Sequence, residues 1–255
     1  MKEKMLMLAR ACPIVSQKYE HLVCIAGITE SGEWRRIYPV QWKTFWGKDA
    51  AKYKKKMWIE YELEEDKPSD HRLESRKVKP GTVRPLYEEK YSEIKKILDK
   101  KLTSIEKLSQ IDHKEVSLGI IKPEIKDFIW KDSPHYKELS EKQKQQTLFE
   151  GSAVKAFVPK ESFQYLFNCN GENNCKGHKM LCEDWELGEL VRHCEDYLKK
   201  GKYKDKDEML QKVKYKMFDE MLKKKEIYFI LGTHFRFPTY MIIGFIAPRK
   251  DDSLI

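Results

Sequence analysis

The sequence predicts an α+β protein, and three observations predict it. Short apolar segments separated by turn residues fill residues 5–80, which is typical of β-strands. Apolar residues then recur every three or four positions over residues 86–108, as in an amphipathic helix. A loop rich in cysteine and histidine precedes two more helical stripes and a final pair of apolar runs. We therefore expect an N-terminal antiparallel β sheet or barrel, a helical middle, and a C-terminal unit closed by a β hairpin.

The N-terminal β region begins with apolar runs at residues 5–9 and 22–28. The turn sequence Glu-Ser-Gly-Glu at 30–33 separates the second run from another at 34–40, so these two runs are expected to form a hairpin. Residues 57–64 alternate between apolar and acidic side chains, the pattern of a half-buried strand. An OB-like or PUA-like barrel would fit this strand count, and the pattern does not choose between them.

The middle of the chain gives the weakest pattern. Residues 86–108 are predicted as one helix, whereas residues 109–150 mix short apolar pieces with a polar helical run. We therefore divide the chain into a β-rich, barrel-like unit at 1–85, a helical or irregular connector at 86–150 and a C-terminal unit at 151–255. A single compact domain is the alternative.

The C-terminal unit is expected to contain two helices and a hairpin. The first helix runs to residue 198, with Asp184 as its N-cap. The second covers residues 205–225, with methionine, leucine and valine on one side and mostly lysine on the other. Apolar runs at 227–231 and 240–247 are separated by a short turn-rich segment, which predicts the closing hairpin.

Composition restricts the class of protein. With 40% hydrophobic residues in 255, the chain is long enough to bury a core. No run approaches the roughly 18 uncharged apolar residues of a membrane span, and the N-terminus lacks a secretory signal pattern, so a cytoplasmic protein with no membrane partner is expected. In that compartment the six cysteines are expected to be thiols or metal ligands rather than disulfides.

Four cysteines and a histidine follow the pattern Cys-x5-Cys-x2-His-x3-Cys-x11-Cys, which predicts a metal site. A Cys-x2-His pair bends the chain tightly enough to supply two ligands of tetrahedral zinc, and nearby glycines permit such a turn. The favoured ligands, with the alternative fourth ligand named last, are Cys169, Cys175, His178, Cys182 and Cys194. An iron-sulfur cluster held by the four cysteines is the competing interpretation. The spacing matches no standard finger.

Two carboxylates, Asp184 and Glu186, follow Cys182 directly. If the metal kept an open position, they would be candidate catalytic bases, with His178 at the reaction centre. The chain would then be a metal-containing hydrolase that acts on nucleic acid, either a nuclease or a base-removing enzyme. Asp184 as a helix cap and Glu186 as a partner of the helix dipole are the simpler interpretation, which makes the metal structural.

Charge and aromatic residues favour nucleic-acid binding. The net charge is +9, and residues 33–56 and 199–225 each carry a local +6, whereas residues 169–198 carry −4. Aromatic rings interleaved with lysines suit unpaired bases, so single-stranded or distorted DNA or RNA is favoured. The second alternative is a protein-interaction scaffold whose lysines only keep it soluble. The candidate nucleic-acid contacts are Arg35, Arg36, Tyr38, Trp42, Lys43, Trp46, Lys212, Lys214 and Lys216.

Overall fold

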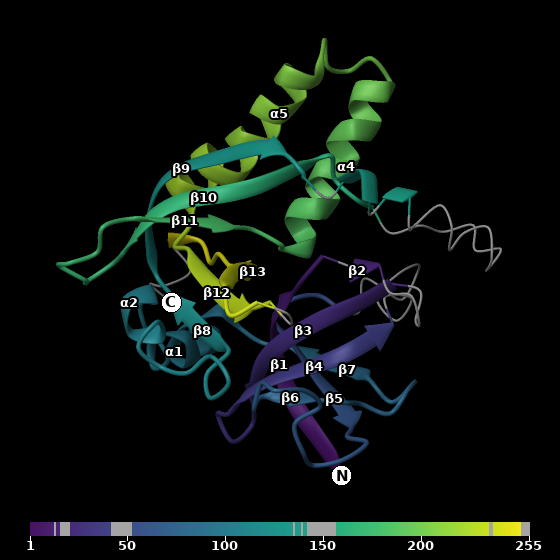
Figure 1. Cartoon of the computed structure of the whole chain (residues 1–255), viewed down its shortest axis with the longest axis vertical. Coiled ribbons are helices and arrows are strands. Elements are labelled where there is room, and N and C mark those ends of the chain that lie inside the picture. Colours follow the sequence, from purple (N-terminus) through teal and green to yellow (C-terminus); the bar gives the residue numbers. More distant parts are fainter. Residues whose placement is uncertain are drawn as a thin grey trace.

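The computed structural model describes residues 1–12, 14–15, 21–41, 53–134, 136–138, 140–141, 157–234 and 237–250. In these residues the protein is a mixed α+β structure with three sheets, which confirms the predicted fold class. Figure 1 shows the N-terminal sheet at one end and two of the longer helices at the other, with the smaller sheets between them. No sheet in the described part of the chain closes into a barrel, so the open-sheet form of the prediction holds.

The N-terminal sheet has the strand order β6-β4-β3-β1-β5-β7, and β2 pairs with β3 outside this path. Neighbours are antiparallel except β4 and β6, which are parallel. The predicted hairpin at 22–40 is β3–β4, and Gly32 takes the positive φ of 82° that its turn requires. The strands are β1 (Lys2–Arg10), β2 (Ile14–Val15), β3 (His21–Thr29), β4 (Trp34–Gln41), β5 (Met57–Glu62), β6 (Ser75–Arg76) and β7 (Arg84–Glu88).

Two three-stranded antiparallel sheets complete the β structure. One has the order β11-β10-β9, from β9 (Pro123–Asp132), β10 (Glu161–Cys169) and β11 (His178–Leu181). The other has the order β13-β12-β8, from β8 (Leu118–Ile121), β12 (Tyr228–Thr233) and β13 (Tyr240–Ile246), and β12–β13 is the predicted closing hairpin.

The helices differ from the prediction in the middle of the chain. Residues 86–108 form no single helix: β7 extends to residue 88, and α1 (Tyr91–Asp99) and α2 (Ile105–Leu108) are separate. The break has a cause, because Leu102 bridges to Ile120 and the Thr103 amide donates to the Ile120 carbonyl of β8. Beyond β11, the helices are α4 (Trp185–Lys199), α5 (Lys206–Lys214), a π-helical segment (Tyr215–Glu220) and α6 (Met221–Lys224). Within the described ranges, no helix combines the length and apolar character needed to cross a bilayer.

The core lies on both faces of the N-terminal sheet. On β1, Met5 and Met7 join a cluster with Ile37 and Tyr61 on one face, because successive side chains point to opposite sides of a strand. Leu6 and Leu8 join a second cluster on the other face, which also contains residues of α1, β8, β12 and β13. A third cluster fills the space between β9–β11 and the C-terminal helices.

The division into units at 1–85, 86–150 and 151–255 stays a prediction.

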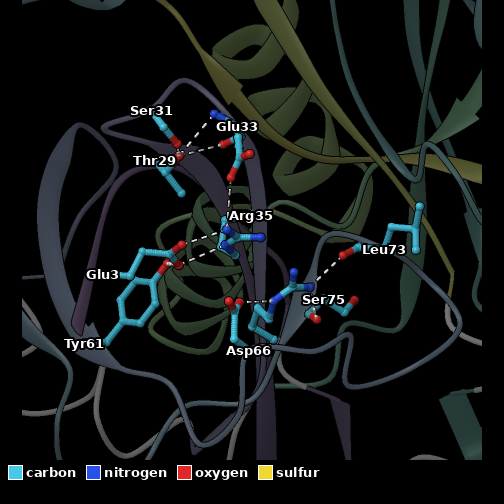
Figure 2. A network of polar contacts seen from close by, with 10 residues as sticks. Glu3, Thr29, Ser31, Glu33, Arg35, Tyr61, Asp66, Leu73 and Ser75 are labelled. Carbon is cyan, nitrogen blue, oxygen red and sulfur yellow. Dashed lines mark hydrogen bonds and ion pairs between the residues drawn. The ribbon is translucent and has the colours of Figure 1, made fainter. Parts of the chain in front are cut away.

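A buried ion pair joins three strands of the N-terminal sheet (Figure 2). Arg35 of β4 donates from Nε and Nη2 to the Glu3 carboxylate of β1, at 2.9 and 2.7 Å. The hydroxyl of the buried Tyr61, on β5, donates to the same carboxylate at 2.7 Å. The ion pair is bidentate and the Arg35 side chain is only 8% exposed. This pair therefore fixes β1, β4 and β5 relative to one another.

Replacing Arg35 by alanine is expected to lower the free energy of unfolding by about 3 kcal/mol, since Glu3 and Tyr61 would be left without their cationic partner. The control is Lys4→Ala. Lys4 follows Glu3 on β1 and forms an exposed ion pair with Glu30, so this change should lower the free energy of unfolding by about 0.5 kcal/mol or less. Urea denaturation followed by circular dichroism measures both values. Equal losses in the two variants would contradict a structural role for Arg35.

Candidate metal centre

Four side chains that can bind a metal meet at the turn between β10 and β11. They are Glu106, Cys169, Cys175 and His178, and their ligand atoms all lie within 4.8 Å of one another. We call these four residues the metal-ligand group. Cys169 is buried and the other three are half-buried, so the group lies just beneath the surface.

The hairpin supplies three of the four residues. Cys169 is the last residue of β10 and points to the buried side, in line with the alternating burial of that strand. The chain then reverses through Gly171 and Gly177, whose φ angles of 80° and 88° few other residues adopt. Backbone hydrogen bonds within this turn bring Cys175 back towards the strand end. His178 begins β11 directly opposite Phe167.

The fourth residue, Glu106, comes from the single turn of α2. Ser104 caps this turn, because its hydroxyl accepts a hydrogen bond from the Lys107 amide. The Lys107 ammonium also pairs with the Glu172 carboxylate of the β10–β11 turn, at 2.8 Å. The cap stabilises the helical turn that carries Glu106, and the ion pair holds this turn against the hairpin.

Backbone amides already point at the two sulfur atoms. The Ile105 amide donates to Cys169 Sγ at 3.3 Å, and the Cys169 amide donates to Cys175 Sγ at 3.2 Å. Burial raises the pKa of the Cys169 thiol to about 12, which the Ile105 amide offsets only in part. Burial would also raise the pKa of Glu106, but hydrogen bonds from Cys175, its own backbone and His178 lower it to about 2. The group therefore presents a carboxylate at Glu106 and a thiol at Cys169, and a bound dication would stabilise the thiolate form of Cys169.

The geometry fits a metal ion better than it fits hydrogen bonds alone. His178 Nε2 lies 3.3 Å from Cys175 Sγ and 2.9 Å from Glu106 Oε1, so atoms that can bind a metal already lie close together. Glu106 Oε2 is buried and has no hydrogen-bond partner among the described residues. Donor atoms around tetrahedral zinc are about 3.4 to 3.8 Å apart, so a small movement of these side chains would produce the required coordination.

The two remaining cysteines lie outside the metal-ligand group. Cys182 is buried where the chain bridges to Ile242, and Cys194 is buried on α4, with its sulfur 3.9 Å from the Tyr203 hydroxyl. The structure therefore brings together Cys169, Cys175 and His178 as expected, with Glu106 in the place expected for Cys182 or Cys194. An iron-sulfur cluster with four cysteine ligands would need all four thiols in one place.

The two candidate catalytic carboxylates also lie outside the metal-ligand group. Asp184 is fully buried, caps α4 through the Glu186 amide at 2.6 Å, and accepts from Lys55 Nζ at 2.8 Å and from the Phe245 amide at 3.0 Å. Burial would lower the pKa of Lys55, but the carboxylates of Asp184 and Glu186 raise it above its usual value. Glu186 is half exposed and pairs with the same ammonium at 3.0 Å. Asp184 and Glu186 are therefore the ion-pair partners of the buried Lys55 ammonium.

Two of the candidate nucleic-acid contacts are buried. Arg35 binds Glu3 as described, and Arg36, 1% exposed, donates from Nη2 to the carbonyl and the hydroxyl of Ser117, both at 3.1 Å. These guanidinium groups stabilise the fold and do not reach the surface. Tyr38 is half-buried on β4. The other candidates in this part of the chain lie outside the described residues: Trp42, Lys43 and Trp46.

The lysines of the second basic region lie at the surface. Lys212 is exposed on α5, and Lys216 is exposed on the π-helical segment, where it pairs with Glu220 at 2.5 Å. Between them Tyr215 is 49% exposed, and no feature of the sequence marks this aromatic side chain as a surface residue. Lys214 is half-buried and bound to Asp127 at 2.5 Å. We call Lys212, Tyr215 and Lys216 the lysine-tyrosine face.

Two family models match the chain. One, described as a domain of unknown function (DUF8758), matches residues 1–103, and another, described as a domain of unknown function (DUF8757), matches residues 99–254. Because the second match covers more than half of the chain, the protein belongs to the DUF8757 family. No curated protein matches the chain. All four residues of the metal-ligand group lie within the DUF8757 match.

Replacing Asp184 separates its two roles. Asp184→Asn keeps a good N-cap but leaves Lys55 without its closest anion, so the free energy of unfolding should fall by about 3 kcal/mol. Asp184→Ala should lose about 1 kcal/mol more, because the cap is removed as well. Glu186→Gln is the control and should lose about 1 kcal/mol or less, since that side chain is exposed. Urea denaturation measures all three, and an Asp184→Asn protein as stable as wild type would refute the structural role.

Proposed function

We propose that this member of the DUF8757 family is a zinc protein whose metal is structural, and that it binds nucleic acid. The observation that carries the first part is the convergence of Glu106, Cys169, Cys175 and His178, in which Glu106 Oε2 is buried with no hydrogen-bond partner in the described part of the chain. A ligand atom in this state is what a metal site without its ion would contain.

The donor set favours zinc over other metals. Two thiolates and an imidazole are soft or borderline ligands, which disfavours magnesium and calcium. Zinc accepts a carboxylate as a fourth ligand at about 2.0 to 2.2 Å, and four protein ligands leave no position for water. A saturated ion would supply no catalytic chemistry here. Its contribution would be to fasten α2 to the β10–β11 hairpin.

The hydrolase alternative loses support from the same geometry. It requires Asp184 or Glu186 beside an open metal position, whereas both carboxylates are partners of Lys55 and neither belongs to the metal-ligand group. His178 remains a ligand in either interpretation.

We expect the purified protein to contain about one zinc ion per chain and to lose it when a ligand is replaced. Cys175→Ser and Glu106→Gln should each weaken zinc binding at least about tenfold, and the melting temperature of both should fall. The matched control is Cys194→Ala, which removes a buried cysteine outside the group and should keep the zinc. Elemental analysis and a chelator competition measure these effects. Iron with sulfide, or a Glu106→Gln protein that binds zinc like wild type, would contradict the proposed site.

The proposal of nucleic-acid binding is supported by the lysine-tyrosine face together with the net charge of +9. An exposed tyrosine ring can stack on an unpaired base, and the ammonium groups of Lys212 and Lys216 on either side of it can neutralise phosphates. The buried Arg35 and Arg36 contribute nothing to this surface. Single-stranded DNA or RNA therefore remains the favoured ligand. The scaffold alternative assigns these lysines to solubility alone.

Fluorescence anisotropy with a labelled single-stranded oligonucleotide tests this proposal. Tyr215→Ala should weaken binding by about 1 to 3 kcal/mol if one base stacks on the ring. Removing Lys212 and Lys216 together should reduce the slope of log affinity against log salt by about 2.

The control for charge is a double alanine variant of Lys77 and Lys100, two exposed lysines outside the lysine-tyrosine face. It should leave the slope unchanged. A flat salt dependence of the wild-type protein would remove phosphate contacts and favour the scaffold alternative.

A further inference from the structure

The two cysteines of the metal-ligand group lie close enough to react with each other. Their sulfur atoms are within 4.8 Å of one another. The Cys169 amide also donates to Cys175 Sγ at 3.2 Å, so the second thiol lies against the backbone of the first. Because the sulfur atoms of a disulfide are about 2.05 Å apart, a shift of at most about 3 Å would join these two.

The turn between the two cysteines can make this movement. In the stretch 170–178 every residue is half-buried or exposed, so a shift there repacks no part of the core. Gly171 and Gly177 lie near its two ends, and both have positive φ angles. Glycine adopts a wider range of backbone angles than other residues, so the turn can change its path at both ends.

The other cysteines are poor competitors for this reaction. With zinc bound, the two cysteine ligands would be thiolates, which is the form of cysteine that attacks oxidants. Burial raises the pKa of the thiols of Cys12, Cys182 and Cys194, which therefore stay neutral. Cys24 is half-buried on β3, outside the metal-ligand group, where its sulfur accepts a hydrogen bond from Arg36 Nη1 at 3.2 Å.

We propose that the metal-ligand group is a redox switch, in which a hydroperoxide joins Cys169 to Cys175 in a disulfide, releases the zinc ion and detaches α2 from the β10–β11 hairpin. This inference rests on the zinc site proposed above and concerns the regulation of that site.

The reaction begins at Cys175, because it is half-buried whereas Cys169 is only 4% exposed. The Cys175 thiolate attacks one oxygen of hydrogen peroxide and becomes a sulfenic acid, and the other oxygen takes up a proton and leaves as water. The Cys169 thiolate then attacks the Cys175 sulfur, whose oxygen takes up a second proton and leaves as water. Two thiolates, one peroxide and two protons thus give one disulfide and two water molecules.

Loss of the two thiolates removes the basis of zinc binding. Glu106 and His178 alone cannot complete the four-ligand shell of a structural zinc ion, so the ion leaves. The Ile105 amide, which donates to Cys169 Sγ at 3.3 Å, then faces a neutral sulfur. The single turn of α2 keeps only Leu108 in the core and the Lys107–Glu172 ion pair, so it opens more readily.

Treatment of the zinc-loaded full chain with hydrogen peroxide tests the proposal. A chromogenic zinc indicator measures the release of zinc, and peptide mass spectrometry after alkylation of the free thiols maps the disulfide. We expect all of the bound zinc to leave in step with one Cys169–Cys175 disulfide, and to bind again after reduction with dithiothreitol. Hydrogen exchange of the Ile105 amide should be at least about tenfold faster in the oxidised protein.

The controls are Cys24→Ser and Cys194→Ala, which remove cysteines outside the metal-ligand group and should release zinc as wild type does. The redox inference is overturned if wild type keeps its zinc under peroxide, if zinc leaves without the Cys169–Cys175 disulfide, or if either control abolishes the release. These results would leave the zinc site standing. A purified protein that contains no zinc would instead overturn the zinc proposal itself, and the redox release with it.

Discussion

The rest of the structure depends on the contacts of one buried carboxylate, that of Asp184. It accepts hydrogen bonds from the first turn of α4, from the Phe245 amide of β13 and from Lys55, next to the N-terminal sheet. The neighbouring Glu183 adds backbone hydrogen bonds to Cys12 and Ile242. An unpaired buried charge costs several kcal/mol, so these segments have to come together at the same time for the carboxylate to be satisfied. One short segment after β11 thus joins the N-terminal sheet, the C-terminal hairpin and α4.

The β10–β11 hairpin determines where the metal-ligand group lies. β10 begins at Glu161 and ends at Cys169, in the metal-ligand group. At the rise of an extended strand, these ends are about 26 Å apart. The turn that carries the metal-ligand group therefore lies far from the end of the hairpin that leads into Asp184. Asp184 fixes its base against the rest of the protein, and the proposed zinc ion would fix its turn.

The sequence predicted local features well and contacts between distant residues poorly. The α+β class, the turn at Gly32, the Asp184 cap and the closing hairpin all depend on residues within a few positions of one another. Glu106 gave no signal, because a glutamate in a polar helical stretch looks like any solvated residue, and its partners lie in a hairpin far along the chain. Successive residues of a strand point to opposite faces, so the sequence places Arg35 and Arg36 on opposite faces of β4, but it does not reveal that both faces are covered. The sequence pattern gives no signal for Tyr215 either, and only the folded chain identifies it as exposed.

The shortness of α2 explains why a metal would be useful at this position. A helix of four residues has almost no intrinsic stability, because one turn makes few hydrogen bonds for the dihedral angles that it fixes. Its place against the hairpin is held by Leu108 in the core, by the Lys107–Glu172 ion pair and by Glu106. The ion pair is exposed on the lysine side and contributes little. Without a metal, one carboxylate oxygen of Glu106 has no hydrogen-bond partner among the described residues, whereas a bound zinc ion would attach α2 to the hairpin more strongly than the ion pair does. The metal would thus order the connection between β7 and β8, while Asp184 and the packed sheets hold the fold as a whole.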